Sequence, residues 1–187
     1  MPELATIYLT DLRLRLEKLR STAEGAIAQC SDASFTASLD AETNSIALTV
    51  KHIAGNLRSR FSDFMVSDGE KPDRRRDDEF ILLPRDSREA LLQRWSESWD
   101  LLLHAVAALT ADDLGRTLTI RGEPHTVVSA LNRNLVHLAY HVGQIVQLAK
   151  HYAGPEWRTL TIARGGSGSY NATLNAEAAN ATRGDAR

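Results

Sequence analysis

The chain has 187 residues, of which 43% are hydrophobic and 25% charged, and its formal net charge is −2. Such a composition is typical of a globular protein with one core, and the small net charge gives no electrostatic reason to expect binding to nucleic acid or to an anionic membrane. The single cysteine, Cys30, excludes an internal disulfide and fits a reducing compartment. No apolar run approaches the ~20 residues that span a bilayer, and no signal peptide is evident, so we expect a soluble, cytoplasmic, single-domain protein.

Two helices are predicted in the first third of the chain. From Glu3 to Gln29, apolar side chains recur at the spacing of a helix with one buried face. A second helix opens within DAETNSIALTVKHIAGNLRSRFSDF, where Thr43 or Asn44 is a suitable N-cap. The predicted core face of this second helix is formed by Ile46, Val50, Ile53, Leu57, Phe61 and Phe64.

Two further helices are predicted in the second half of the chain. One begins with Asp86 or Ser87 as its N-cap, and its spacing turns Trp95 and Trp99 toward the core, where we expect them to fill space between helices. The other spans roughly residues 126–152 and ends before a Gly-Pro pair, which is a typical stop signal.

The connecting segments differ in character. The stretch DGEKPDRRRDDEFILLP, between the second and third helices, is long enough to suggest a functional loop. Its arginines 74–76, followed directly by the acidic residues 77–79, favour the simpler interpretation of a solvated, self-neutralising loop. The stretch LTIRGEPHT, residues 118–126, has β-branched residues around Arg121-Gly122 and predicts a small extended turn or hairpin.

Together these elements predict an all-α protein, a four-helix bundle over residues 1–164 with a long loop between its second and third helices. From residue 165 onward glycine, serine, alanine and asparagine dominate, so residues 165–187 are predicted to be a flexible tail. In helix bundles, metal and cofactor sites are built from side chains that project inward from facing helices.

The fourth predicted helix carries a polar line along the edge of its apolar face. His137 and His141 lie four residues apart, on the same face of the helix, so both rings can reach one atom. Asn134 and Gln144 extend this line in either direction. The second helix has a similar line that includes His52 and Asn56, and the two lines can meet inside a bundle.

Three neutral imidazoles suit zinc, nickel, copper or ferrous iron, and three protein ligands with a fourth position open are typical of a catalytic metal site. Asn56, Asn134 and Gln144 are then candidates for contacts to the ligating rings or to a substrate. The HxxxH spacing lacks the glutamate of HExxH, which argues against a zincin protease. Spacing alone leaves open whether His52 is a ligand or an ordinary core or surface residue.

The three remaining histidines are weaker candidates for metal ligands. His104 lies near the end of a separate predicted helix, and His125 follows a proline in the predicted hairpin. His151 lies near a helix C-terminus, where the helix dipole favours a protonated ring.

The chain resembles the DinB/YfiT-like superfamily of metal-dependent enzymes, and within it an uncharacterised bacterial branch. The resemblance rests on TVKHIAGNLRSRFSDF, DGEKPDRRRDDEF, TIRGEPHTV, HLAYHVGQIV and WRTLTIARG. It implies a four-helix bundle with up-down-down-up connectivity and a divalent metal, often nickel or zinc, held by His52, His137 and His141. It also implies a homodimer and the use of a low-molecular-weight thiol.

The leading functional hypothesis is a metal-dependent enzyme that transfers such a thiol to an electrophile or hydrolyses a small substrate. The reacting group would be a thiolate or a water on the metal. The absence of an evident Glu or Asp base beside the histidines favours thiol chemistry over hydrolysis. Two alternatives stay open: a non-catalytic metal-binding or stress-associated bundle, and a plain bundle whose histidines are hydrogen-bonded in the core.

Overall fold

The computed structural model describes the backbone of residues 2–184 and shows a mostly helical chain with one small sheet. In order, the elements are α1 (Pro2–Ile27), α2 (Asp32–Thr36), α3 (Ile46–Phe61), η1 (Arg76–Phe80), α4 (Arg88–Ala107), η2 (Ala111–Asp113), β1 (Thr117–Ile120), β2 (Glu123–Thr126), α5 (Val127–Ala153), η3 (Gly154–Glu156) and α6 (Ser167–Gly184). The chain divides into two units, residues 1–155 and residues 156–187.

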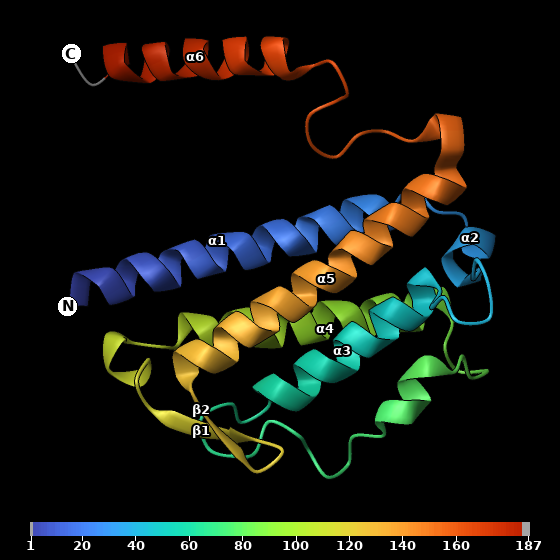
Figure 1. The fold of residues 1–187 in the computed structure, drawn as a ribbon, viewed down its shortest axis with the longest axis vertical. Helices are drawn as coiled ribbons and strands as arrows, with labels where there is room; N and C mark the ends of the chain where they lie inside the picture. The colour runs from blue at the N-terminus through green and yellow to red at the C-terminus, as the bar shows by residue number, and fades with distance from the viewer. Residues whose placement is uncertain (1, 185–187) are drawn as a thin grey trace. The chain divides into compact units, whose positions relative to one another are not determined.

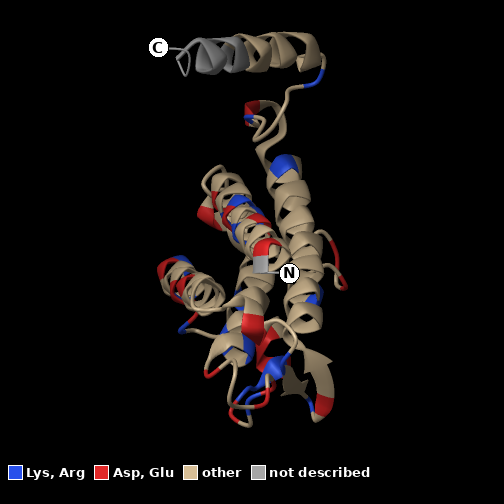
Figure 2. Ribbon diagram, turned by 90° about the vertical axis from the view of Figure 1, so that its left-hand side faces the viewer, with Lys and Arg blue, Asp and Glu red and all other residues tan. Residues whose placement is uncertain are grey.

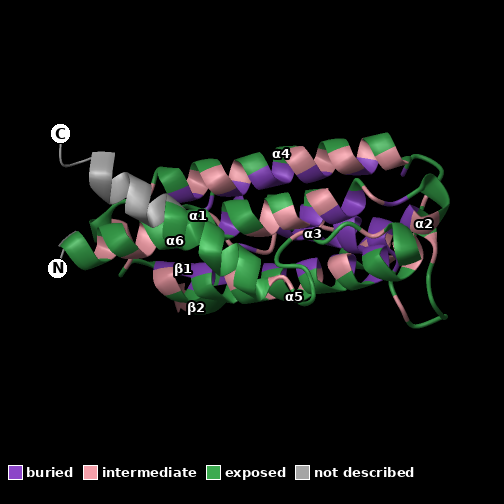
Figure 3. Ribbon diagram, turned by 90° about the horizontal axis from the view of Figure 1, so that it is seen from above, coloured by how far each residue is buried: buried purple, intermediate pink, exposed green. Residues whose placement is uncertain are grey.

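The four long helices of the first unit pack against one another along their lengths. Helix α1 lies against α5 and helix α3 against α4, while further contacts join α3 to α5 and α1 to α4. The chain runs in one direction along α1 and α5 and in the opposite direction along α3 and α4 (Figure 1). The buried residues lie where these helices face one another (Figure 3).

The helix boundaries follow from their capping residues. Ser45, Ser87 and Thr126 each accept a hydrogen bond from a backbone N–H three residues ahead, at the starts of α3, α4 and α5. Of the two predicted caps of α4, Asp86 and Ser87, the structure confirms Ser87, and α5 begins close to the predicted residue 126. The prediction of Thr43 or Asn44 as the cap of α3 is wrong, because the helix begins one residue after Ser45.

The core matches the apolar pattern of the sequence. Trp95 and Trp99 are almost fully buried, and their rings pack 5.4 Å apart between centroids. The predicted face of α3 is buried throughout, from Ile46 to Phe61, and Phe64 beyond its end is buried as well. These side chains fix α3 in the interior, with its flanks against α4 and α5.

The predicted hairpin forms, and it is attached to the loop between α3 and α4. Strands β1 and β2 pair antiparallel, and the turn residues Arg121 and Gly122 both have positive φ, as a tight two-residue hairpin turn requires. The Asp68 carboxylate accepts the backbone N–H groups of Arg121 and Gly122, both at 2.8 Å. Charged residues of both signs gather where this loop meets the hairpin (Figure 2).

The second unit contains the segment for which a flexible tail was predicted. Residues 167–184 form α6, whose alanines favour a helix. The flexibility of the segment stays a prediction. Across the described residues, no helix combines the length and the apolar character that crossing a membrane requires.

Candidate metal centre

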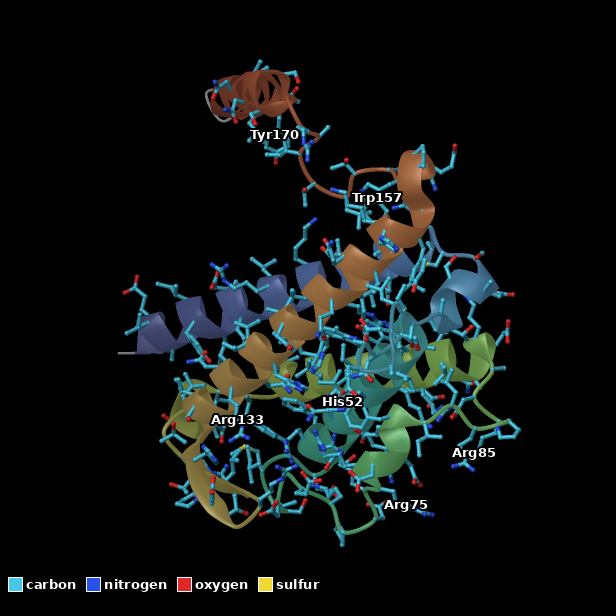
Figure 4. All side chains as sticks on the ribbon, turned by 45° about the vertical axis from the view of Figure 1, so that its right-hand side comes forward. His52, Arg75, Arg85, Arg133, Trp157 and Tyr170 are labelled. Carbon is cyan, nitrogen blue, oxygen red and sulfur yellow. The ribbon has the colours of Figure 1, made fainter. Side chains whose placement is uncertain are left out.

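Three histidine rings from two helices meet inside the first unit. His52 comes from the side of α3 that faces α5 (Figure 4), and His137 and His141 come from successive turns of α5. The Nε2 atom of His137 lies 3.2 Å from Nε2 of His52 and 3.1 Å from Nε2 of His141. One ligand atom from each ring fits within 4.8 Å of the other two.

These distances suit a single bound ion. For imidazoles bound to zinc at about 2.0–2.1 Å in tetrahedral geometry, the nitrogens lie roughly 3.3 Å apart. Among the described residues, these histidines are the one group of three metal-ligating side chains that meets this closeness. The predicted ligand set therefore coincides with a real cluster, whereas His104, His125 and His151 take no part in it.

The outer nitrogens of two rings are held by acceptors. His52 Nδ1 donates to Glu79 Oε2 at 2.8 Å, and His141 Nδ1 donates to Gln144 Oε1 at 2.7 Å. A proton on Nδ1 leaves the Nε2 lone pair of each neutral ring pointing at the other rings. A cation between the three nitrogens would satisfy these lone pairs, so the donor set fits a metal.

The surroundings keep the α5 histidines neutral. Burial, together with the neighbouring His141 and His52, lowers the pKa of His137 to about 3. Burial also lowers the pKa of His141, an effect that the hydrogen bond to Gln144 partly opposes. Because a ligating imidazole must be unprotonated, both rings are available to a metal at neutral pH.

A buried ion pair between Arg74 and Glu79 lies at the outer nitrogen, Nδ1, of His52. Burial raises the pKa of Glu79, but hydrogen bonds from His52 and Arg74 outweigh this and hold it below its usual value. Arg74 donates two bonds to the carboxylate, Nε to Oε1 at 2.8 Å and Nη2 to Oε2 at 2.9 Å. The side chains of Arg74 and Glu79 are only 3% and 8% exposed.

The structure therefore corrects the interpretation of the charged loop as fully solvated. Residues 75–77 are exposed as that interpretation requires, but Arg74 and Glu79 at its two ends turn inward. The 3₁₀ helix η1 places Glu79 toward α3, and the ring of the next residue, Phe80, stacks on His52 at 5.0 Å between centroids.

Gly55 was an overlooked signal for this contact. A glycine within a helix costs about 1 kcal/mol relative to alanine, so it usually has a packing reason. Here a Cβ on Gly55 would lie 2.8 Å from Glu79 Cδ and closer still to Oε1. The glycine, three residues after His52, lets the Glu79 carboxylate approach the surface of α3.

The predicted polar partners divide into two groups. Gln144 supports His141, as described above. Asn56 and Asn134 are hydrogen-bonded to each other, Asn134 Nδ2 donating to Asn56 Oδ1 at 3.3 Å. Both asparagines line an open cavity of about 180 Å³ beside His52 and His137. Within the part of the chain that the structure describes, Asn134 Oδ1 and His137 Nδ1 are buried without a hydrogen-bond partner.

The comparisons with known proteins identify a family but do not indicate an activity. Residues 3–166 match the family described as "Protein of unknown function (DUF1572)", and the chain belongs to that family. The matched range includes all three histidines, Glu79 and the cavity. No curated protein matches the chain.

Proposed function

We propose that this member of the family of unknown function is a metal-dependent enzyme in which His52, His137 and His141 hold a divalent transition metal, zinc or nickel. The observation that carries the proposal is the meeting of three Nε2 atoms beside an open cavity, with acceptors on two of the three outer nitrogens. A plain core cluster would need neither lone pairs directed at one another nor a cavity beside them.

We further propose that the chain is a DinB-like four-helix bundle with up-down-down-up connectivity. Two observations support this assignment: the shared direction of α1 and α5 against that of α3 and α4 (Figure 1), and the placement of the histidines on α3 and α5. These are the second and fourth of the long helices, the positions that the sequence resemblance implies.

A bound divalent metal with an open position would lower the pKa of a thiol or water and orient it toward an electrophile. The residues of the chain then have distinct roles. Glu79 keeps the proton of His52 on Nδ1, and Gln144 does the same for His141. Asn56 and Asn134 offer amide groups to a substrate in the cavity.

Thiol transfer is favoured over hydrolysis by the state of the nearest carboxylate. Both oxygens of Glu79 accept hydrogen bonds from Arg74, and one also accepts from His52, so this group is poorly placed to take a proton from water. A thiol held by the metal would, by contrast, lose its proton to solvent at neutral pH, because coordination would lower the pKa of the thiol, and it would need no carboxylate base. A low-molecular-weight thiol is therefore the proposed second substrate.

The first test is elemental analysis of untagged protein, beside a variant with His137→Ala and His141→Ala. We expect about one transition metal per wild-type chain and none in the variant, with unchanged helical circular dichroism in both. Metal-free wild type, even after incubation with zinc and nickel, would refute the proposal.

The second test separates an enzyme from a metal store. In cobalt-substituted protein, an exchangeable ligand position seen by absorption spectroscopy is expected for an enzyme. A saturated coordination sphere, together with no thiol transfer to standard electrophiles, would instead indicate the non-catalytic metal-binding bundle.

We also propose that the protein is a homodimer, as the sequence resemblance implies. Sedimentation over a dilution series tests this, and a monomer at every concentration would overturn it.

A further inference from the structure

We infer that the cavity beside the histidines binds a small organic anion, a carboxylate or phosphate, whose charged group contacts arginines while its body faces the metal centre. This inference assigns a substrate class to the site and rests on the proposed function for its catalytic meaning.

The walls of the cavity carry concentrated positive charge. Five arginines line it, from α3, the loop before α4, the hairpin turn and α5: Arg60, Arg74, Arg76, Arg121 and Arg133. No aspartate or glutamate is among the described lining residues. The chain as a whole has a net charge of −2, so this positive charge is a local feature and not a property of the whole surface.

Two carboxylates next to the cavity neutralise only part of this charge. Glu70 accepts from Arg60 at 3.0 Å and from Arg121 at 3.1 Å, and it lies 3.4 Å from Arg74. Glu79 pairs with Arg74, as described above. These three arginines therefore have a structural explanation, since they attach the loop and the hairpin to α3.

Arg76 and Arg133 have no such explanation. Within the described residues, neither pairs with a carboxylate, and both are exposed at the cavity. Arg76 lies over the Phe80 ring, 5.1 Å from its centroid, and that ring stacks on His52. Arg133 lies on α5 one turn before His137 (Figure 4). A planar guanidinium with free donors is well suited to a carboxylate or a phosphate.

The interior of the cavity points to an organic ligand and not to an inorganic ion. Apolar side chains share the lining with the arginines: Phe61, Phe64, Leu118, Ile120 and Ala130. Asn134 is only 7% exposed, and its Oδ1 atom has no hydrogen-bond partner among the described residues. A buried acceptor of this kind normally has a donor, which a hydroxyl, amine or thiol of a ligand would supply. The volume of about 180 Å³ limits that ligand to a small molecule, since a cavity of about 150 Å³ accommodates benzene.

Calorimetric titration of the metal-loaded protein tests this inference, with phenyl phosphate, benzoate, benzamide and inorganic phosphate as probes. We expect one of the two aromatic anions to bind at least tenfold more tightly than neutral benzamide and than inorganic phosphate. The preferred aromatic anion shows whether the natural ligand carries a carboxylate or a phosphate. Equal affinity for benzamide, or for inorganic phosphate, would overturn the assignment of an organic anion.

Substitutions then distinguish the contribution of the arginines to anion binding from the binding of the metal. Arg133→Ala and Arg76→Ala should each weaken anion binding at least tenfold while the metal content stays at the wild-type level. Arg75→Ala is the matched control, because Arg75 is adjacent in sequence, pairs with Asp78 and does not line the cavity. Unchanged affinity in both cavity variants, or an equal loss in the control, would refute the arginine contact.

The two proposals fail independently in this design. A chain that takes up no metal even after incubation with zinc and nickel, but that binds the anion through these arginines, would support the anion site and overturn the proposed function. A chain that binds metal but has no affinity for the anions would support the metal site of the proposed function and overturn the anion site.

Discussion

Lys51 and His52 are neighbours in the sequence, yet α3 directs them into two buried polar clusters of opposite character. The comparison between these clusters separates polar groups that stabilise the fold from polar groups that are available to a ligand.

In the Lys51 cluster, the ammonium and both carboxylate oxygens each have a partner. Lys51 Nζ donates to Asp86 Oδ2 and to the carbonyl of Ile81, both at 2.6 Å. The Asp86 carboxylate also accepts from Arg94 at 2.5 Å and from the backbone N–H of Leu83 at 2.9 Å. A buried ion pair with every partner in place holds the end of the α3–α4 loop against both helices.

The histidine cluster is only half satisfied. Glu79 and Gln144 hold two outer nitrogens, but the three Nε2 atoms face one another. His137 Nδ1 and Asn134 Oδ1 have no partner among the residues that the structure describes. A cavity adjoins these groups. Buried polar atoms without partners are costly, so an arrangement that retains several of them beside a cavity indicates a site for a ligand.

The largest effect on stability is expected from a substitution that breaks the Lys51 cluster. Asp86→Ala leaves Lys51 buried without its counter-ion, which should lower the free energy of unfolding by about 3–5 kcal/mol. Urea denaturation measures this loss, and the metal content of the folded protein should not change. A loss below about 1 kcal/mol would show that the cluster does not stabilise the fold.

Removing the proposed metal should have the next largest effect. At a free metal concentration of about 100 Kd, binding stabilises the folded state by about 2.7 kcal/mol, so a chelator should lower the midpoint of urea unfolding. The variant with His137→Ala and His141→Ala should not respond. A response equal to that of wild type would show that the metal binds elsewhere.

Acidification should weaken the Lys51 cluster in a defined pH range. Burial raises the pKa of Asp86, but hydrogen bonds from Lys51 and Arg94 outweigh this and lower it from 3.8 to about 2. Because the folded-state pKa is the lower one, the stabilisation is complete above pH ~4 and is lost as the pH falls toward 2. The loss should reach about 2 kcal/mol.

The measurement compares the unfolding free energies of wild type and Asp86→Asn between pH 6 and pH 3. The difference between the two proteins should narrow as the pH falls. A difference that stays constant over this range would contradict the lowered pKa.

Glu79→Gln should weaken metal binding without abolishing it. The amide oxygen can still accept the hydrogen bond from His52 Nδ1, but the side chain loses the charge that orients the ring and pairs with Arg74. Comparable changes behind a ligating histidine cost about 10–100-fold in metal affinity. Competition with a coloured chelator measures this affinity. An unchanged affinity would show that Glu79 does not support the metal centre.

The smallest effect on stability is expected from replacing two helical glycines, Gly143 and Gly55, by alanine, and the two substitutions should differ. Gly143→Ala on α5 places its Cβ in open space and should stabilise the protein by roughly 0.5–1 kcal/mol. Gly55→Ala should fail to stabilise it and should reduce metal affinity, because its Cβ displaces Glu79. Equal stabilisation by both substitutions would mean that Glu79 moves aside without cost.

The elements and the site differ in how far the sequence could predict them. The helices follow from apolar spacing and capping residues, as the Ser87 cap shows, and the HxxxH spacing located two of the three clustered rings. Such features depend only on residues that are close together in the sequence, so they can be predicted without knowing the fold.

The partners of these rings were less accessible to prediction. Glu79 reaches His52 across 27 residues, and its inward direction depends on how η1 is placed. The same limit applies to Arg133, an exposed helical residue whose position at the cavity depends on where the hairpin and the loop meet α5. Gly55 was a local clue to this contact, but Gly143, two residues after His141, shows that a helical glycine near a histidine can also face open space.

The contact between Asp68 and the hairpin turn has a consequence for the order of folding. It joins residues more than fifty positions apart, so its closure costs more chain entropy than the local contacts within each helix. We expect the helices to form early and the wall of the cavity late. In refolding experiments, recovery of helical circular dichroism should therefore precede recovery of anion binding.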